Sequence, residues 1–130
     1  MELAADACRV PVAYNWPVFG EDAFRTGTGV HAAAIVKAEQ KGDAWLADRI
    51  YSGVPAGWFG LSQKIEISPM SGISNVRYWL KAHGYDAADE GLANHVFEAA
   101  KQCDHTFTDA EVNALCAEYA AQQQPAGAAA

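Results

Sequence analysis

Apolar residues recur at helical spacing in several segments of this chain, and glycine or proline separates one segment from the next. Val76, Trp79 and Leu80 would share one face of a helix, and residues 89–103 repeat that spacing. Strict alternation of apolar and polar residues occurs in residues 64–68. The sequence therefore predicts a mainly α fold with one short strand or hairpin.

Helix-boundary signals place the individual helices. A helix over residues 30–40 would end at Gly42, because glycine tolerates the left-handed conformation that commonly closes a helix. Asp43 is an N-cap residue for a second helix reaching Tyr51, with Trp45 expected to face inward. Residues 108–111, Thr-Asp-Ala-Glu, match the capping box, in which a hydroxyl and a carboxylate satisfy free helix amides reciprocally.

The two ends of the chain are predicted to be less regular. A short helix is expected over residues 3–8, whereas Pro11 and Pro17 favour an extended segment over residues 10–19. The low-complexity residues 122–130 are expected to be disordered.

Charge narrows the classes of partner. The chain has 9 Lys and Arg against 16 Asp and Glu, a formal net charge of -7. A phosphate backbone would be repelled by this field, so nucleic-acid binding is not expected. No apolar run has the length of a membrane span, and we expect a soluble, cytoplasmic protein without membrane contact.

The cysteines do not suggest a disulfide scaffold. Cys8, Cys103 and Cys116 are odd in number and widely spaced, unlike the dense, even sets of secreted domains. Cys103 and His105 stand two residues apart, but no second pair of matching spacing follows them. We therefore expect plain thiols and no metal site in this chain.

His31 is the first candidate for chemistry. The segment Thr28-Gly29-Val30-His31 would put this imidazole at a helix start, where the helix dipole favours its neutral, proton-accepting form. Taken alone, a single histidine in such a place is more often structural than functional.

The surrounding pattern adds a family resemblance. Gly20-Glu21-Asp22-Ala23-Phe24 and the segment ending at His31 resemble the G-E-N-A-F and S-G-I-H stretches that follow the catalytic barrel in the 2-isopropylmalate synthase and homocitrate synthase family. The resemblance continues through Tyr51, through residues 54–60 and 64–72, and into the final helix at residues 108–116.

Members of that family join acetyl-coenzyme A to a 2-oxo acid, with a divalent metal in the barrel and linker subdomains that reach across a dimer. The resemblance implies that His31 transfers a proton and that Tyr51 acts as a hydrogen-bond donor or acid in a partner's active site. The alternative for Tyr51 is a half-buried aromatic residue at a helix end.

Departures from the family pattern leave the substrate open. Residues 39–48 resemble an insertion, and the turn at residues 68–72 lacks the family's Lys and His. Leucine biosynthesis and a pathway that uses another 2-oxo acid therefore both remain possible roles. The barrel's His-x-His metal ligands have no counterpart here, so the metal is expected in a barrel outside this chain and the isolated chain is expected to be inactive.

The resemblance divides the chain into four parts. Residues 1–9 correspond to a remnant of the last barrel helix, 10–60 to linker subdomain I, 61–119 to linker subdomain II, and 120–130 to a disordered tail. Such small subdomains favour a homodimer or docking to a barrel in cis or in trans. Two alternatives are a stand-alone dimerisation or regulatory module and a plain helical domain with a fortuitous motif.

Overall fold

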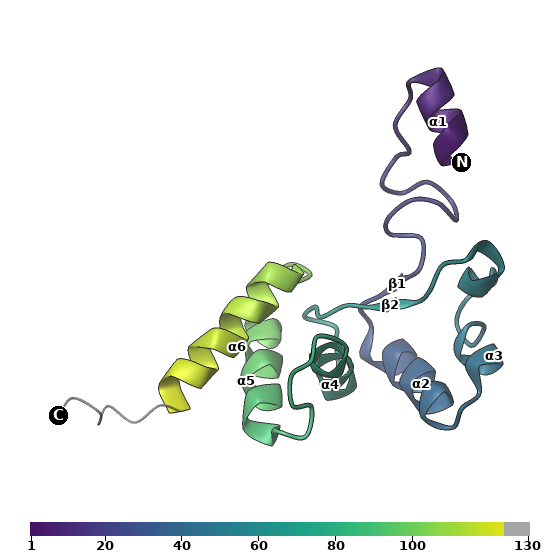
Figure 1. Ribbon diagram of the computed structural model, residues 1–130. Coiled ribbons are helices and arrows are strands. Elements are labelled where there is room, and N and C mark those ends of the chain that lie inside the picture. The colour runs from purple at the N-terminus through teal and green to yellow at the C-terminus, as the bar shows by residue number, and fades with distance from the viewer. Residues whose placement is uncertain (124–130) are drawn as a thin grey trace.

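The computed structural model describes residues 1–123 and is mainly helical, as predicted (Figure 1). In chain order, its elements are α1 (Glu2–Cys8), β1 (Arg25–Thr26), α2 (Gly29–Gln40), α3 (Ala44–Ala47), the 3-10 helix η1 (Ala56–Phe59), β2 (Lys64–Ile65), α4 (Ile73–Ala82), α5 (Glu90–Gln102) and α6 (Asp109–Gln123).

Helix α4 stands between two helical groups, with α2 and α3 on one side and α5 and α6 on the other (Figure 1). Each side has its own buried cluster of apolar side chains. The larger cluster joins α4, α5 and α6 and contains Ile67, Val76, Trp79, Leu80, Leu92, Ala93, Val96, Ala100, Val112 and Cys116. The smaller cluster contains Ala32, Ile35, Ala38, Ala47 and Ile65. Burial of one face against a neighbour is what makes the short helices α2 to α6 stable.

The sheet is a parallel pair of two-residue strands drawn from distant parts of the chain. Arg25 pairs with Lys64 and Thr26 with Ile65. The strand predicted over residues 64–68 is thus shorter than expected, and its partner is not a hairpin neighbour. The Arg25 guanidinium also lies 2.6 Å from the Glu66 carboxylate, which adds an ion pair across the two strands.

A buried polar cluster ties the turn after β1 to the start of α4. The carbonyl of Gly27 accepts hydrogen bonds from Ser71 Oγ at 2.6 Å and from Asn75 Nδ2 at 3.3 Å. Asn75 Nδ2 also donates to the Glu66 carbonyl at 2.9 Å, and Asn75 Oδ1 accepts from the Gly72 amide at 3.2 Å. Asn75 is fully buried, so these contacts replace the water that its amide loses on folding.

The extended segment predicted over residues 10–19 is wrong for its second half, which folds into tight turns. Phe19 donates its amide to the Pro17 carbonyl at 2.9 Å, and Val18 between them has φ of 70°. A β-branched residue rarely adopts this backbone conformation. The chain therefore turns back on itself around Pro17, and α1 projects from the rest without burying a residue (Figure 1).

Helix α3 is correctly capped but shorter than predicted. The Asp43 carboxylate accepts a hydrogen bond from the Leu46 amide at 2.9 Å, which confirms the predicted N-cap. The helix ends at Ala47, and turns carry the chain on to Tyr51. Trp45, predicted to face inward, is 66% exposed, because a helix of four residues buries only a narrow face.

Helix α6 confirms the predicted capping box and changes the expected start of the tail. The Glu111 carboxylate accepts from the Thr108 amide at 2.7 Å, and Thr108 Oγ1 accepts from the Glu111 amide at 3.3 Å. Residues 120–123, assigned to the tail, continue the helix. Residues 124–130 lie outside the described part of the chain.

The helices of residues 1–123 are too short or too polar for any one of them to cross a lipid bilayer.

Replacing Asn75 tests the polar cluster. We expect Asn75→Ala to lower the free energy of unfolding by about 1–3 kcal/mol, because the buried carbonyl of Glu66 and the amide of Gly72 lose a partner. Asn94→Ala, at an exposed position of α5, is the control and should change it by less than about 0.5 kcal/mol. Equal unfolding free energies in urea for the two variants would contradict this role.

The α6 cap should make stability depend on acidity. Hydrogen bonds from the Thr108 amide, from His105 and from the Thr108 hydroxyl lower the pKa of Glu111 from 4.5 to about 2. Because the folded-state pKa is lowered, this stabilisation is present above pH 4.5 and is lost as the pH falls toward 2. The difference in melting temperature between wild type and Glu111→Gln should therefore shrink over that interval.

The control for this measurement is Glu118→Gln, which removes a charge from an exposed position of the same helix. Hydrogen bonds to Asp104 and then Glu111 raise the pKa of His105, so its own contribution is complete below pH 6.5 and disappears at higher pH. A difference for Glu111→Gln that stays constant with pH would contradict the assignment.

Candidate functional site

His31 and Tyr51, the two site residues predicted from the sequence, lie against each other in the structure. Their ring centroids are 4.0 Å apart and the ring planes differ by 21°, which is a stacked arrangement. His31 belongs to the first turn of α2, whereas Tyr51 follows α3. Both side chains are exposed, and Tyr51 retains 51% of its accessible surface.

The N-terminus of α2, and with it His31, is positioned by a close approach of backbone to backbone. The Gly29 amide donates to the Met70 carbonyl at 3.0 Å. A Cβ atom on Gly29 would lie 2.6 Å from the Gly72 nitrogen, which is closer than a side-chain carbon can come. Glycine at position 29 is therefore required for α2 to begin directly against the start of α4.

The position of Tyr51 depends on the packing of α3 against α2. Its neighbour Ile50 is half-buried against the smaller apolar cluster and donates its amide to the Leu46 carbonyl at 2.9 Å. The chain leaves this turn with the Ser52 hydroxyl bonded to the Val54 carbonyl at 2.6 Å. The residues on either side of Tyr51 are thus held by these bonds, and its ring stacks on the imidazole of His31.

Stacking leaves the polar edges of both rings free for chemistry. Within residues 1–123, the imidazole nitrogens of His31 and the hydroxyl of Tyr51 make no hydrogen bond. An imidazole nitrogen can donate or accept a hydrogen bond, and a phenol can donate one. The pair can therefore serve a reacting group brought to it from outside the chain.

The first 70 residues, which include this pair, leave many large apolar side chains exposed. Large apolar side chains remain exposed at Met1, Leu3, Val10, Tyr14, Trp16, Phe19, Val30, Trp45, Leu46, Tyr51, Val54, Trp58, Phe59, Leu61 and Met70. Each belongs to the first 70 residues, and the described residues after 70 add none. Exposed apolar surface of this extent is typical of a region that contacts another protein.

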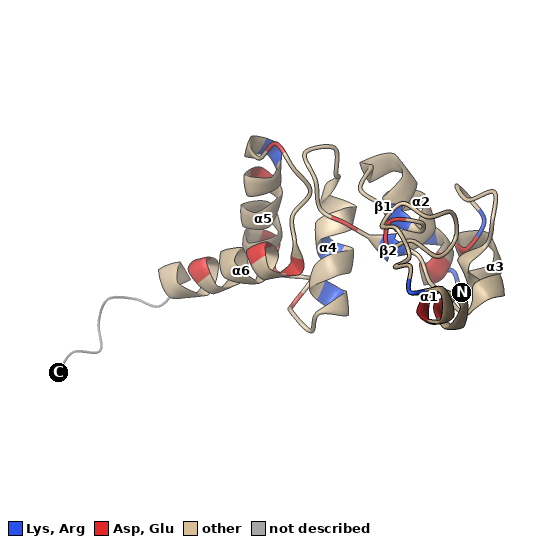
Figure 2. Cartoon of the chain, turned by 90° about the horizontal axis from the view of Figure 1, so that it is seen from above, with Lys and Arg blue, Asp and Glu red and all other residues tan. Residues whose placement is uncertain are grey.

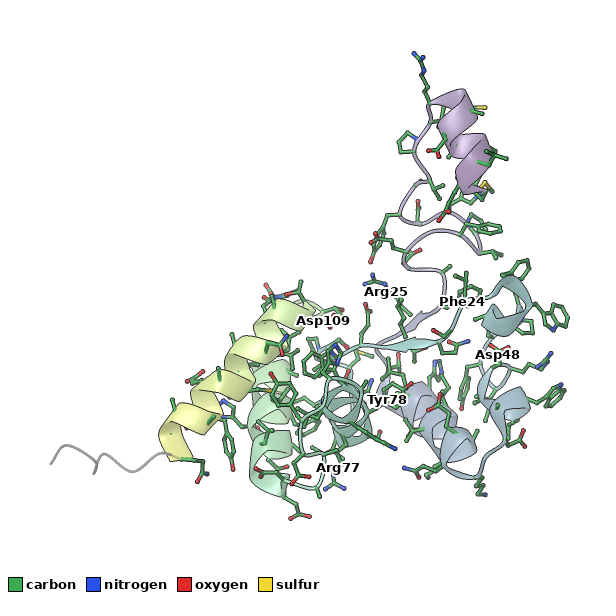
Figure 3. All side chains as sticks on the ribbon, in the orientation of Figure 1. Phe24, Arg25, Asp48, Arg77, Tyr78 and Asp109 are labelled. Carbon is green, nitrogen blue, oxygen red and sulfur yellow. The ribbon has the colours of Figure 1, made fainter. Side chains whose placement is uncertain are left out.

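One feature of this surface was not predicted from the sequence. The Arg49 guanidinium lies over two indole rings, 4.7 Å from the centroid of Trp45 and 5.4 Å from that of Trp58. Nearby, the Asp48 carboxylate accepts a hydrogen bond from the Gly57 amide at 3.1 Å and so holds η1 against the end of α3 (Figure 3). The isolated tryptophans of the sequence gave no sign that they would meet on one arginine.

The residues considered for metal binding have other partners. Cys103 Sγ contacts the carbonyls of Ala100 and His105 at 3.2 and 3.0 Å. The His105 ring bonds to Asp104 and Glu111. In the part of the chain that the structure describes, no three His, Cys, Asp or Glu side chains gather as a metal site would require.

Comparison with known proteins finds similarity to homocitrate synthases. The chain is 29% identical over 94 residues to a homocitrate synthase of Pyrococcus abyssi, an alignment that covers 72% of this chain and 23% of that protein. It is 29% identical over 106 residues to a homocitrate synthase of Pyrococcus horikoshii, covering 82% of this chain and 26% of that protein. No protein-family model matches.

These alignments support a resemblance at the level of the 2-isopropylmalate and homocitrate synthase family. The chain spans about a quarter of the length of the curated relatives that it matches. The similarity therefore concerns a condensing-enzyme-related region and not a complete enzyme of that kind.

Gly29 offers a direct test of how the site is positioned. We expect Gly29→Ala to lower the free energy of unfolding by about 1–3 kcal/mol, because the added methyl group would collide with the Gly72 backbone. Gly53→Ala is the matched control, since a Cβ there meets nothing within 4 Å. Urea unfolding of both variants measures the difference, and an unperturbed Gly29→Ala protein would rule out the close approach.

Proposed function

We propose that this chain is the linker region of an acyl-coenzyme A-dependent condensing enzyme of the 2-isopropylmalate synthase type. In this proposal it contributes His31 and Tyr51 to a partner's active site and is not catalytic alone. The observation that carries the proposal is the stacked, exposed pair of these two rings, which the sequence places 20 residues apart. The similarity to homocitrate synthases supports the same reading.

The reaction would join acetyl-coenzyme A to a 2-oxo acid, in the cytoplasm and within amino-acid biosynthesis. His31 would move a proton during the condensation, because both of its ring nitrogens are open. Tyr51 would support the imidazole through its ring face and offer its hydroxyl as hydrogen-bond donor or acid. In this proposal the divalent metal would be bound by the barrel.

The exposed apolar surface supports action on a partner. The pair lies on the half of the chain that leaves large apolar side chains uncovered, including Val30 at 71% exposure beside His31. A catalytic barrel, in cis or from the other subunit of a homodimer, would bury this surface and exclude water from the pair. Burial of this kind would also strengthen the electrostatic interactions that catalysis needs.

A second candidate is a stand-alone dimerisation or regulatory module. The same exposed apolar residues favour it, because a docking surface needs no free imidazole. The two candidates differ in what they require of His31, which is essential to the first and dispensable in the second.

A complementation assay tests the proposal. The purified chain would be mixed with a full-length homocitrate synthase whose own linker histidine has been replaced, and coenzyme A release would be followed with several 2-oxo acids. We expect turnover to return with the chain and to fall by about 100-fold or more with His31→Ala, the scale of a lost proton-transfer group.

Asn94→Ala, at an exposed position of α5 on the other side of α4 from α2, is the control and should keep most of the rescue. Tyr51→Phe keeps the ring that stacks on His31 but lacks the hydroxyl. The turnover restored by this variant therefore shows whether the hydroxyl of Tyr51 is needed in addition to the stacking. A chain that is folded and bound to the synthase but restores no turnover would refute the catalytic role of His31 and leave the regulatory module.

A further inference from the structure

A second candidate site lies away from the stacked pair. A cavity of about 490 Å³ opens between β2, α4 and the start of α6. Its apolar wall includes Ile65, Phe107 and Val112, and neither His31 nor Tyr51 reaches it. This volume falls within the range of about 300–1,000 Å³ that small-molecule sites occupy.

Polar and charged side chains from three elements line this cavity. Arg25 from β1, Tyr78 from α4 and Asp109 from α6 are marked in Figure 3, and Figure 2 shows basic residues on the ribbon of β1 and β2. Desolvation, followed by the nearby Glu39 carboxylate, raises the pKa of Tyr78, so its phenol is a neutral part of the wall. The cavity thus combines apolar walls with a charged rim.

The carboxylates of the rim already have partners. Glu66 lies 2.6 Å from the Arg25 guanidinium. Asp109 Oδ1 accepts a hydrogen bond from Trp79 Nε1 at 2.8 Å. Lys64, in contrast, has no carboxylate within 4 Å among the described residues. An ammonium without a carboxylate partner favours an anionic group close to it.

His83 provides a second polar group with an open side. Its ring stacks on the Trp79 indole at 3.8 Å, and its Nδ1 lies 2.9 Å from the Trp79 carbonyl. Because a carbonyl only accepts hydrogen bonds, Nδ1 carries the proton and the Nε2 atom is directed elsewhere. In this tautomer Nε2 is a hydrogen-bond acceptor, 3.7 Å from Asp109 Oδ2, and it does not attract a carboxylate.

We propose that this cavity binds a small organic anion that carries one carboxylate on an apolar body. Lys64 attracts the carboxylate, and Ile65, Phe107 and Val112 enclose the apolar part. A ligand with several charges is disfavoured, because Glu66 and Asp109 lie on the same rim and the whole chain has a net charge of -7. The proposal is independent of the function assigned to His31.

Binding of phenylacetate to the full chain tests this site, with amide chemical shifts followed by NMR. We expect saturable binding in the millimolar range, with the largest shifts at Ala82, Phe107 and Val112. Phenylacetamide, which lacks the charge, and acetate, which lacks the apolar body, should both bind more weakly.

Two variants and one control identify the residues responsible. Lys64→Met should weaken phenylacetate binding by roughly three- to fivefold, the scale of one exposed ion pair. Lys41→Met, at an exposed lysine that does not line the cavity, should leave it unchanged. Ala82→Phe, at an exposed lining position, should abolish binding by filling the opening without disturbing the core.

Three results would each overturn the proposal. These are equal affinity for phenylacetamide and phenylacetate, equal weakening by Lys64→Met and Lys41→Met, and shifts that gather around His31 and not around the cavity.

Discussion

The contact between the turn after β1 and the start of α4 is the constraint on which the remaining structure depends. There the Gly27 carbonyl receives the Ser71 hydroxyl and the Asn75 amide, and the backbones of Gly29 and Gly72 nearly touch. These contacts orient α2 relative to α4 and join the two apolar clusters. Helix α2 in turn sets the direction of His31. The position of this imidazole therefore depends on how α2 packs against the start of α4.

Local signals in the sequence predicted the helices well, because caps and helical spacing act over a few residues. The Asp43 cap and the Thr108–Glu111 capping box are present as expected. Long-range pairing was not predictable: nothing near Arg25 identifies Lys64 as its strand partner. The prediction that Trp45 faces inward was also wrong. An apolar residue at helical spacing is ordinarily buried, but Trp45 is exposed.

The candidate site was predicted in part. His31 and Tyr51 were proposed through a family resemblance, whereas their stacking depends on how α2 and α3 pack, which no local pattern encodes. The cavity beside Lys64 and His83 was not predicted at all, because its lining comes from segments that lie more than 80 residues apart at the extremes, from Arg25 to Val112. A site whose lining is assembled by tertiary packing can be predicted only once that packing is known.

The parallel pairing of β1 with β2 has a consequence for the order of folding. Helices α4, α5 and α6 follow one another and bury a common core, so their contacts are local and form at little cost in chain entropy. Closing the segment between Thr26 and Lys64 demands a much longer loop for only two pairs of residues. We infer that the C-terminal helices assemble first and provide the template on which α2, and then the imidazole it carries, is placed last.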